Sequence, residues 1–210
     1  MKTRLTPFLS SEEAAALAAC LFRDAVRNAS RAGLEVLVAY APREGRAALE
    51  ALLAGEASGV RFFEQEGADL GERLEAAAAR AYAELSGPVV ITGTDTLIPP
   101  KILKDTLRAL SNSDADFALG PVEDGGYYLV GLRRYEPGLF RGVAWGTERV
   151  YRQTAANAAR LGFRLLQGLP RLYDVDTPAD FDRLRRELLA NRRRASRLAP
   201  ATYEWFKERG

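Results

Sequence analysis

The chain has 210 residues, of which 47% are hydrophobic and 28% charged, and its 30 basic and 28 acidic side chains leave a net charge of +2. This length suits one α/β domain with a full core, and so small a net charge gives no general reason to expect a nucleic acid or a membrane as partner. The chain has no histidine, which excludes a Ser-His-Asp triad, a Cys-His pair and the histidine zinc sites.

The single cysteine and the distribution of apolar residues exclude further kinds of site and of protein. Cys20 is the only cysteine, so an internal disulfide, a thiolate zinc site and an iron–sulfur centre are excluded, and we expect a buried thiol there. Any bound metal must be held mainly by oxygen, which indicates Mg²⁺, Mn²⁺ or Ca²⁺. The first twenty residues lack a secretory pattern, and no run reaches the roughly 20 apolar residues of a membrane span, so we expect a cytoplasmic protein.

Helical and strand patterns alternate along most of the chain. Ser10 and Glu13 have the spacing of a capping box, and Gly33 stops the helix that follows. The predicted helices are 11–32, 46–54, 69–85, 99–110, 147–161, 178–190 and 201–209, and the predicted strands are 34–41, 60–63, 88–92, 116–119, 127–132 and 163–166. This alternation is typical of a parallel sheet covered by helices on both faces.

An acidic turn, Gly93-Thr94-Asp95, follows strand 88–92, the one that most clearly reads as buried. In open parallel sheets, ligands bind beyond the carboxyl ends of the strands. An acid at that point, next to a glycine that lets a ligand approach, suits a site for a metal and a diphosphate. Alternatively, Asp95 only caps the helix that follows.

Two carboxylates stand two residues apart in Asp174-Val175-Asp176-Thr177-Pro178. In an extended chain they point the same way, and a divalent cation would screen their repulsion. The alternative is that this segment only caps the helix that begins at Pro178, with Thr177 as N-cap.

A loop of acids, then glycines, then tyrosines enters strand 127–132: Glu123, Asp124, Gly125, Gly126, Tyr127 and Tyr128. Glycines let backbone come close to a ligand, and tyrosines can stack on a ring or donate a hydrogen bond. A tight hairpin with an Asp-Gly turn is the alternative.

Three further segments carry weaker signals. Lys2-Thr3-Arg4 can grip phosphate oxygens, although composition alone favours a frayed basic terminus. The acid-rich helix start in 65–73 indicates structure more than chemistry. Arg192-Arg193-Arg194 with Arg197 is typical of a solvated helix face and not of a nucleic-acid site.

Taken in order, these segments resemble one known family. The strings are KTRL-x-P, Q-x-G-A-D-L-G-E-R, G-T-D, G-P-x-E-D-G-G-Y-Y-L-x-G-L, W-x-T and D-V-D-T-P-x-D. They are similar to those of the bacterial glycosyltransferase-like family of the radical-SAM/selenodomain-associated transferase type, within the nucleotide-diphospho-sugar transferase (GT-A) superfamily. The resemblance runs from Lys2 to about Leu189, and the string from Gly120 to Leu132 is highly specific. Wider relatives include guanylyltransferases.

The resemblance implies a single α/β domain of the GT-A type over 1–190, with a mostly parallel central sheet and helices on both faces, followed by a basic C-terminal extension, 191–210, that ends in a short helix. It implies that Asp95 and Asp176, helped by Asp174, bind the metal. Lys2, Arg4 and Thr94 would then bind the nucleotide phosphates, and Glu123, Gly125, Gly126 and Tyr127 would face the acceptor or the sugar. Asp95 and Asp124 are the catalytic candidates, with Asp124 orienting or deprotonating an acceptor hydroxyl. Trp145 and Thr147 match a family element to which we assign no role.

Two features depart from the family. Its members open with an apolar strand and a glycine-containing loop before the KTRL string, and this N-terminal strand, which lies in the middle of the superfamily's sheet, is missing from the present sequence. After G-T-D the family favours Ser-Pro, where this chain has Thr96-Leu97.

The sequence therefore predicts a transferase that uses Mg²⁺ or Mn²⁺ and a nucleotide donor. Our first hypothesis is a glycosyltransferase acting from a nucleoside-diphosphate sugar. The alternatives are a guanylyltransferase-like nucleotidyltransferase that releases pyrophosphate, and a non-catalytic nucleotide-binding module. The expected partners are a nucleotide or nucleotide-sugar donor and a small-molecule acceptor, without nucleic acid or a membrane span. A homodimer is left open.

Overall fold

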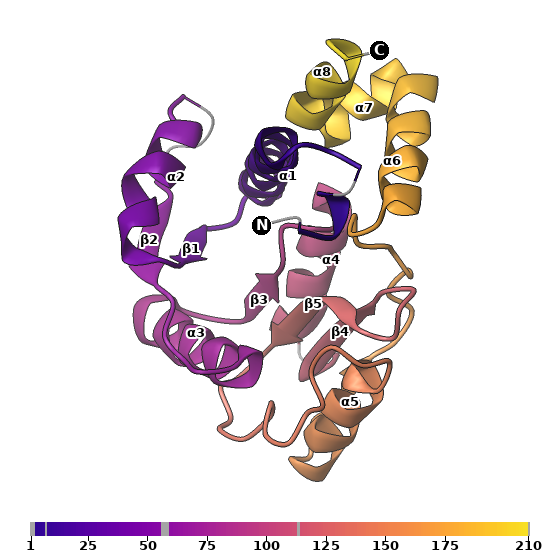
Figure 1. Ribbon diagram of the computed structural model, residues 1–210. Coiled ribbons are helices and arrows are strands. Elements are labelled where there is room, and N and C mark those ends of the chain that lie inside the picture. Colours follow the sequence, from indigo (N-terminus) through magenta and orange to yellow (C-terminus); the bar gives the residue numbers. More distant parts are fainter. Residues whose placement is uncertain (1–2, 7, 56–58, 113, 210) are drawn as a thin grey trace.

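Helices and strands alternate along the chain as the sequence predicts (Figure 1). The computed structural model describes residues 3–6, 8–55, 59–112 and 114–209. The helices there are η1 (Thr3–Leu5), α1 (Ser11–Arg31), η2 (Arg43–Gly45), α2 (Arg46–Leu52), α3 (Leu70–Glu84), α4 (Pro100–Ser111), α5 (Val150–Arg160), α6 (Pro178–Ala190), α7 (Arg192–Leu198) and α8 (Pro200–Lys207). The strands are β1 (Leu37–Tyr40), β2 (Arg61–Glu64), β3 (Val89–Thr92), β4 (Phe117–Pro121), β5 (Tyr127–Leu132) and β6 (Leu165–Leu166).

The strands form two sheets, a parallel pair and a mixed four-stranded sheet. β1 and β2 pair in parallel, and the second sheet has the order β3-β5-β4-β6. There β5 runs antiparallel to both β3 and β4, whereas β4 and β6 are parallel. β3, β4 and β6 therefore run in the same direction, in agreement with the predicted mostly parallel sheet. β5 alone is reversed, because the loop between β4 and β5 is too short for the crossover that parallel neighbours need. The predicted α/β class itself is confirmed.

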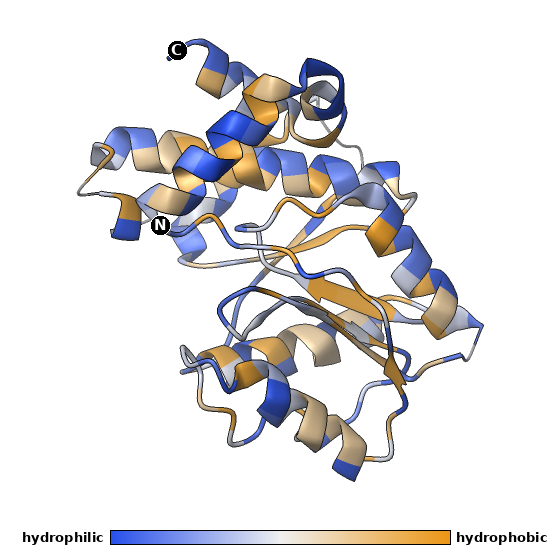
Figure 2. Ribbon diagram, turned by 90° about the vertical axis from the view of Figure 1, so that its right-hand side faces the viewer, coloured by the Kyte–Doolittle hydropathy of each residue, from blue (hydrophilic) through white to orange (hydrophobic). Residues whose placement is uncertain are grey.

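Helices cover both faces of the four-stranded sheet, also as predicted. Successive strand residues point to opposite faces, and the core divides accordingly. Phe117, Leu119, Val130 and Leu132 pack with α3 and α5 on one face. Ala118 and Leu129 pack with α4 and the end of α1 on the other. Figure 2 shows the apolar strands enclosed between helices whose outer faces are hydrophilic.

Helix α1 joins the two sheets. Within the described residues no strand pairs with both β1 and β3, and none precedes α1. Phe22 and Val26 of α1 pack in the cluster formed around β1 and β2, whereas Ala29 and Ala32 pack in the cluster beside β3. One helix therefore fixes how the sheets sit relative to each other.

Capping boxes mark where α1 and α6 begin. Glu13 N donates to Ser10 Oγ at 3.1 Å and Ser10 N donates to Glu13 Oε2 at 2.9 Å, which confirms the predicted capping box at α1. Thr177 and Asp180 form a second capping box at α6. Each box satisfies amide groups that the first helical turn leaves without partners.

The C-terminal segment is part of the core. Asp24 of α1 accepts hydrogen bonds from Ala201 N at 3.0 Å, from Thr202 N at 2.9 Å and from Thr202 Oγ1 at 2.6 Å, at the start of α8. Helix α7 is a finding that the sequence reading missed, and the domain limit at 190 stays a prediction. None of the described helices combines the length and apolar composition that a bilayer crossing requires.

Candidate functional site

The turn after β3 and the Asp174–Asp176 segment lie side by side. Val175 N donates to the carbonyl oxygen of Asp95 at 3.0 Å. Thr96, which is buried, donates its hydroxyl to Asp174 Oδ1. Two strings that stand almost eighty residues apart in the sequence are thus joined by one backbone and one side-chain hydrogen bond.

Four carboxylates from three segments influence one another at this place. The pKa of Asp174 is raised to about 6, first by burial and then by the negative charges of Asp176, Asp95 and Asp124, while the hydrogen bond from Thr96 opposes the rise. Burial and like charges both disfavour the ionised carboxylate. The arrangement therefore concentrates negative charge that a cation would neutralise.

The donor set fits a hard divalent cation that shares its coordination with a ligand. The described residues contain no group of three side chains that could hold a metal by themselves. Mg²⁺, however, is usually held by one or two carboxylates, with waters and substrate phosphates completing the octahedron. Asp95 with Asp174 or Asp176 meets that smaller requirement.

The loop between β4 and β5 pairs with the residues that lead into the Asp174–Asp176 segment. Val122 forms a parallel bridge with Leu172, and Leu172 N donates to Pro121 O at 3.0 Å. Asp124 is exposed, and its Oδ1 accepts a hydrogen bond from Gly126 N at 3.0 Å. This register places Asp124 near Asp174, which agrees with the electrostatic coupling of the two carboxylates.

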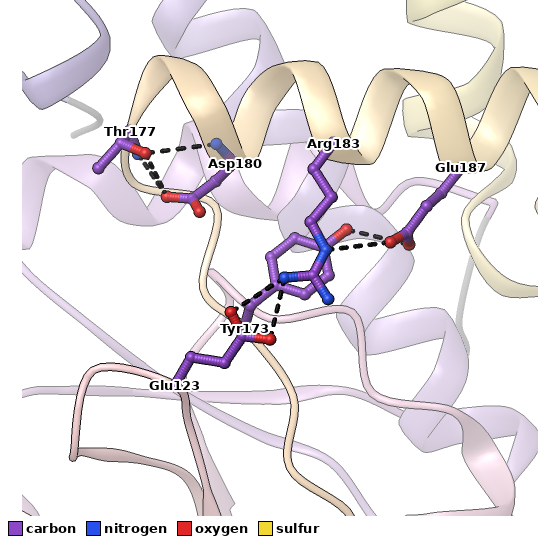
Figure 3. Close-up of polar contacts among 6 residues, drawn as sticks. All are labelled: Glu123, Tyr173, Thr177, Asp180, Arg183 and Glu187. Carbon is purple, nitrogen blue, oxygen red and sulfur yellow. Dashed lines mark hydrogen bonds and ion pairs between the residues drawn. The ribbon is translucent and has the colours of Figure 1, made fainter.

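Glu123 points to helix α6 (Figure 3). Arg183 Nη1 donates to Glu123 Oε1 at 2.9 Å and to Oε2 at 3.0 Å. A carboxylate held in this way has a protein partner, whereas the sequence reading assigned Glu123 to the substrate. The sequence did not single out Arg183 and gave Thr96 no role beyond a departure from the family, because their partners are distant in the chain.

The glycines of the loop serve close packing. Gly125 has a φ of 91°, and a Cβ there would lie 2.5 Å from the carbonyl oxygen of Glu148. Tyr151 N donates to Gly125 O at 3.0 Å. A Cβ on Gly126 would lie 3.2 Å from a methyl of Val122. The loop is therefore shaped by its contact with the segment before α5, and a role of these glycines toward a substrate stays a prediction.

The two tyrosines after the loop have buried hydroxyls. The ring of Tyr127 packs edge-on against Trp145, with centroids 6.4 Å apart, and burial raises the pKa of Tyr127. Tyr128 donates its hydroxyl to Pro170 O at 3.2 Å. Trp145 in turn lies against the start of α3, since a Cβ on Gly71 would be 2.9 Å from its Nε1. The W-x-T string thus connects the acidic start of α3 to the glycine loop.

The predicted phosphate-binding residues are partly described. Lys2 lies outside the described residues. Arg4 is exposed in η1, and its neighbour Leu5 is fully buried in the same core cluster as Val175. Thr94 is exposed in the turn after β3. The roles of Arg4 and Thr94 toward a ligand stay predictions.

A separate cavity of about 660 Å³ lies between residues 137–142 and helix α5. Its polar lining includes Arg141, Gln153, Asn157 and Arg160. None of the site residues predicted from the sequence lines it, so we do not connect it with the carboxylates.

Comparisons with known proteins identify the family and a similar solved structure. A family model described as "Uncharacterized protein conserved in bacteria (DUF2064)" matches residues 25–147. The crystal structure of a putative nucleotide-diphospho-sugar transferase from Desulfovibrio desulfuricans is similar with a TM-score of 0.86 and 30% sequence identity, over 99% of this chain and 88% of that one. Among curated proteins, none matches the chain.

Proposed function

We propose that this chain is a metal-dependent glycosyltransferase acting from a nucleoside-diphosphate sugar. It belongs to the bacterial DUF2064 family and to the nucleotide-diphospho-sugar transferase superfamily. Its strings favour the radical-SAM/selenodomain-associated type within that superfamily, acting in the cytoplasm. The observation that carries the proposal is the convergence of Asp95, Asp174, Asp176 and Asp124 from three separate segments.

The carboxylates divide into two groups by position. Asp95 with Asp174 and Asp176 would hold Mg²⁺ or Mn²⁺, which when bound supplies positive charge to a diphosphate leaving group. Thr96 positions Asp174 through its hydroxyl. Arg4 would add charge stabilisation from the neighbouring η1 segment.

Asp124 is the residue we assign to the acceptor. It is exposed on the loop between β4 and β5, and no described cation pairs with it in the salt bridges of the structure. A carboxylate in that position can accept the proton of an attacking hydroxyl. Glycosyl transfer would then release a free nucleoside diphosphate, whereas nucleotidyl transfer would release pyrophosphate, so product analysis separates the two activities.

A thermal-shift screen of nucleotides and nucleotide sugars, with and without Mn²⁺, tests the proposal. A ligand at about 100 times its Kd stabilises the folded state by roughly 2.7 kcal/mol, which for a chain of this size raises Tm by about 5–10 °C. We expect a Mn²⁺-dependent rise with one base, lost in Asp95→Asn.

The matched control is Asp182→Asn, which removes an exposed carboxylate of α6 away from the cluster and should keep the full rise. No rise with any nucleotide would contradict the proposal. A rise that persists in Asp95→Asn would favour a non-catalytic nucleotide-binding module.

A further inference from the structure

The proposed site needs two segments held at a fixed spacing. The loop 122–126 carries Asp124, and residues 173–176 carry Asp174 and Asp176. Three hydrogen bonds lie within the loop, Val122 N to Gly126 O at 3.2 Å, Gly125 N to Val122 O at 3.5 Å and Gly126 N to Asp124 Oδ1, and a fourth, from Tyr151 N to Gly125 O at 3.0 Å, joins the loop to α5. They give the loop its shape without fixing its tip to the second segment.

Helix α6 supplies the missing connection through Arg183 (Figure 3). Its guanidinium holds both carboxylate oxygens of Glu123, donates from Nε to Glu187 Oε1 at 3.2 Å, and lies 3.8 Å from the ring centroid of Tyr173. Tyr173 completes the network by donating its hydroxyl to Glu187 Oε2 at 3.1 Å. One side chain thus joins residues adjacent to Asp124 and to Asp174.

The same helix also holds Asp176. Asp180 Oδ2 accepts hydrogen bonds from Asp176 N at 3.2 Å and from Thr177 N at 2.8 Å. The first turns of α6 are therefore in contact with both segments: Asp180 with the backbone at Asp176, and Arg183 with the loop tip at Glu123. A rigid helix between them sets the distance.

This network is too exposed to be a main source of fold stability. The side chains of Arg183, Glu123 and Glu187 are 41%, 52% and 41% exposed, and exposed ion pairs contribute little to the free energy of unfolding. Its geometry is nevertheless demanding, because lysine cannot stack on a ring while it pairs with two separate carboxylates as a planar guanidinium does.

We propose that Arg183 and Glu123 are positioning residues that hold the loop 122–126, and with it Asp124, against the segment 173–176. Glu123 acts through Arg183 and does not bind the substrate. The expected effect of these residues on turnover rests on the proposed function. Their expected effect on the position of the loop does not.

Hydrogen–deuterium exchange tests the loop directly. In Arg183→Met we expect the amides of 122–126 to exchange about fivefold faster, the upper end of what an exposed ion pair stabilises, with α1 and α4 unchanged. Arg186→Met is the control, since within the described part of the chain Arg186 donates only to Asp182 O in its own helix. Equal exchange of the loop in the two variants overturns the proposal.

A double-mutant cycle tests the assignment of Glu123. We expect Arg183→Met, Glu123→Ala and the double variant to lower kcat to a similar extent, by about tenfold, because misplacing a catalytic group is costly and partners in one contact are not additive. The KM for the donor should hold, since the donor binds at other carboxylates. Additive losses would show that Glu123 acts independently of Arg183 and would overturn the proposal. If the wild type turns over no donor, the proposed function fails and the exchange result still decides whether Arg183 holds the loop.

Discussion

At the scale of single residues, the glycine loop shows how one string can carry both structure and chemistry. Glycine was expected there to let a ligand approach. In the structure, Gly125 lets the loop meet the backbone at Glu148, while the adjacent Asp124 stays exposed. The glycine and the acid thus have different functions: the first shapes the loop, and the second is left available for chemistry.

Gly125→Ala should destabilise the protein by about 2–3 kcal/mol, because the new Cβ would clash with backbone and φ is positive. Urea unfolding monitored by circular dichroism measures this loss. Gly142→Ala is the matched control: Gly142 has a φ of 68° with no atom within 4 Å of a built Cβ, so it should cost only about 1 kcal/mol. Equal losses would mean that the contact with Glu148 is unimportant.

At the scale of elements, α8 belongs to the core although the sequence suggested an extension. Phe206 is 1% exposed and packs with Phe181 of α6, with ring centroids 5.1 Å apart. The buried residues of this cluster also come from η1, α1 and α7. The helix that supports the site, α6, is therefore itself supported by the C-terminal helices.

Phe206→Ala should lower the free energy of unfolding by about 3–5 kcal/mol, the range for removing a buried phenylalanine ring. Phe8→Ala offers a control on the same partner, since Phe8 also contacts Phe181 but is 51% exposed, and should cost under about 1 kcal/mol. The two losses are compared by chemical denaturation. Similar small values would mean that 191–210 is a dispensable extension after all.

At the scale of the whole molecule, the two sheets are joined by helix packing instead of by a continuous ladder. The solvent-accessible surface is 11326 Å², whereas a compact protein of 23.0 kDa is expected to expose about 9,600 Å². The molecule is thus less compact than an average monomer of its mass. The position of α1 across both sheets is therefore central to the stability of the fold.

Acid stability of the whole chain should depend on Asp116. Its carboxylate accepts a hydrogen bond from Arg164 and pairs with Arg133 at 2.5 Å, and these contacts lower its pKa from 3.8 to about 2. A lowered pKa stabilises the folded state at pH values above the ordinary pKa of an aspartate. This stabilisation is lost as pH falls from about 4 towards 2.

Asp116→Asn should therefore be less stable than the wild type at pH 6, and the difference should shrink between pH 4 and pH 2. Urea unfolding at a series of pH values measures it, with Asp182→Asn as the exposed control. A difference that stays constant down to pH 2 would contradict the assignment of the shift to Arg164 and Arg133.

The sequence by itself determined the α/β class, the positions of most helices and strands, the capping box at α1, the N-cap at Thr177 and the candidate carboxylates. Those features depend on patterns within a few residues: periodicity, caps and the ends of buried strands. It did not reveal α7, whose arginine-rich pattern resembles any solvated helix face until Ala195 is seen in the core.

Only the tertiary structure decided which distant groups meet. The direction of β5, the pairing of Glu123 with Arg183, and the hydrogen bond from Thr96 to Asp174 join residues that no local pattern links. A periodic pattern indicates that one face of an element is buried. It does not indicate which element covers that face, because this depends on the packing of the whole chain. The candidate carboxylates were therefore predictable, and the contacts that position them were not.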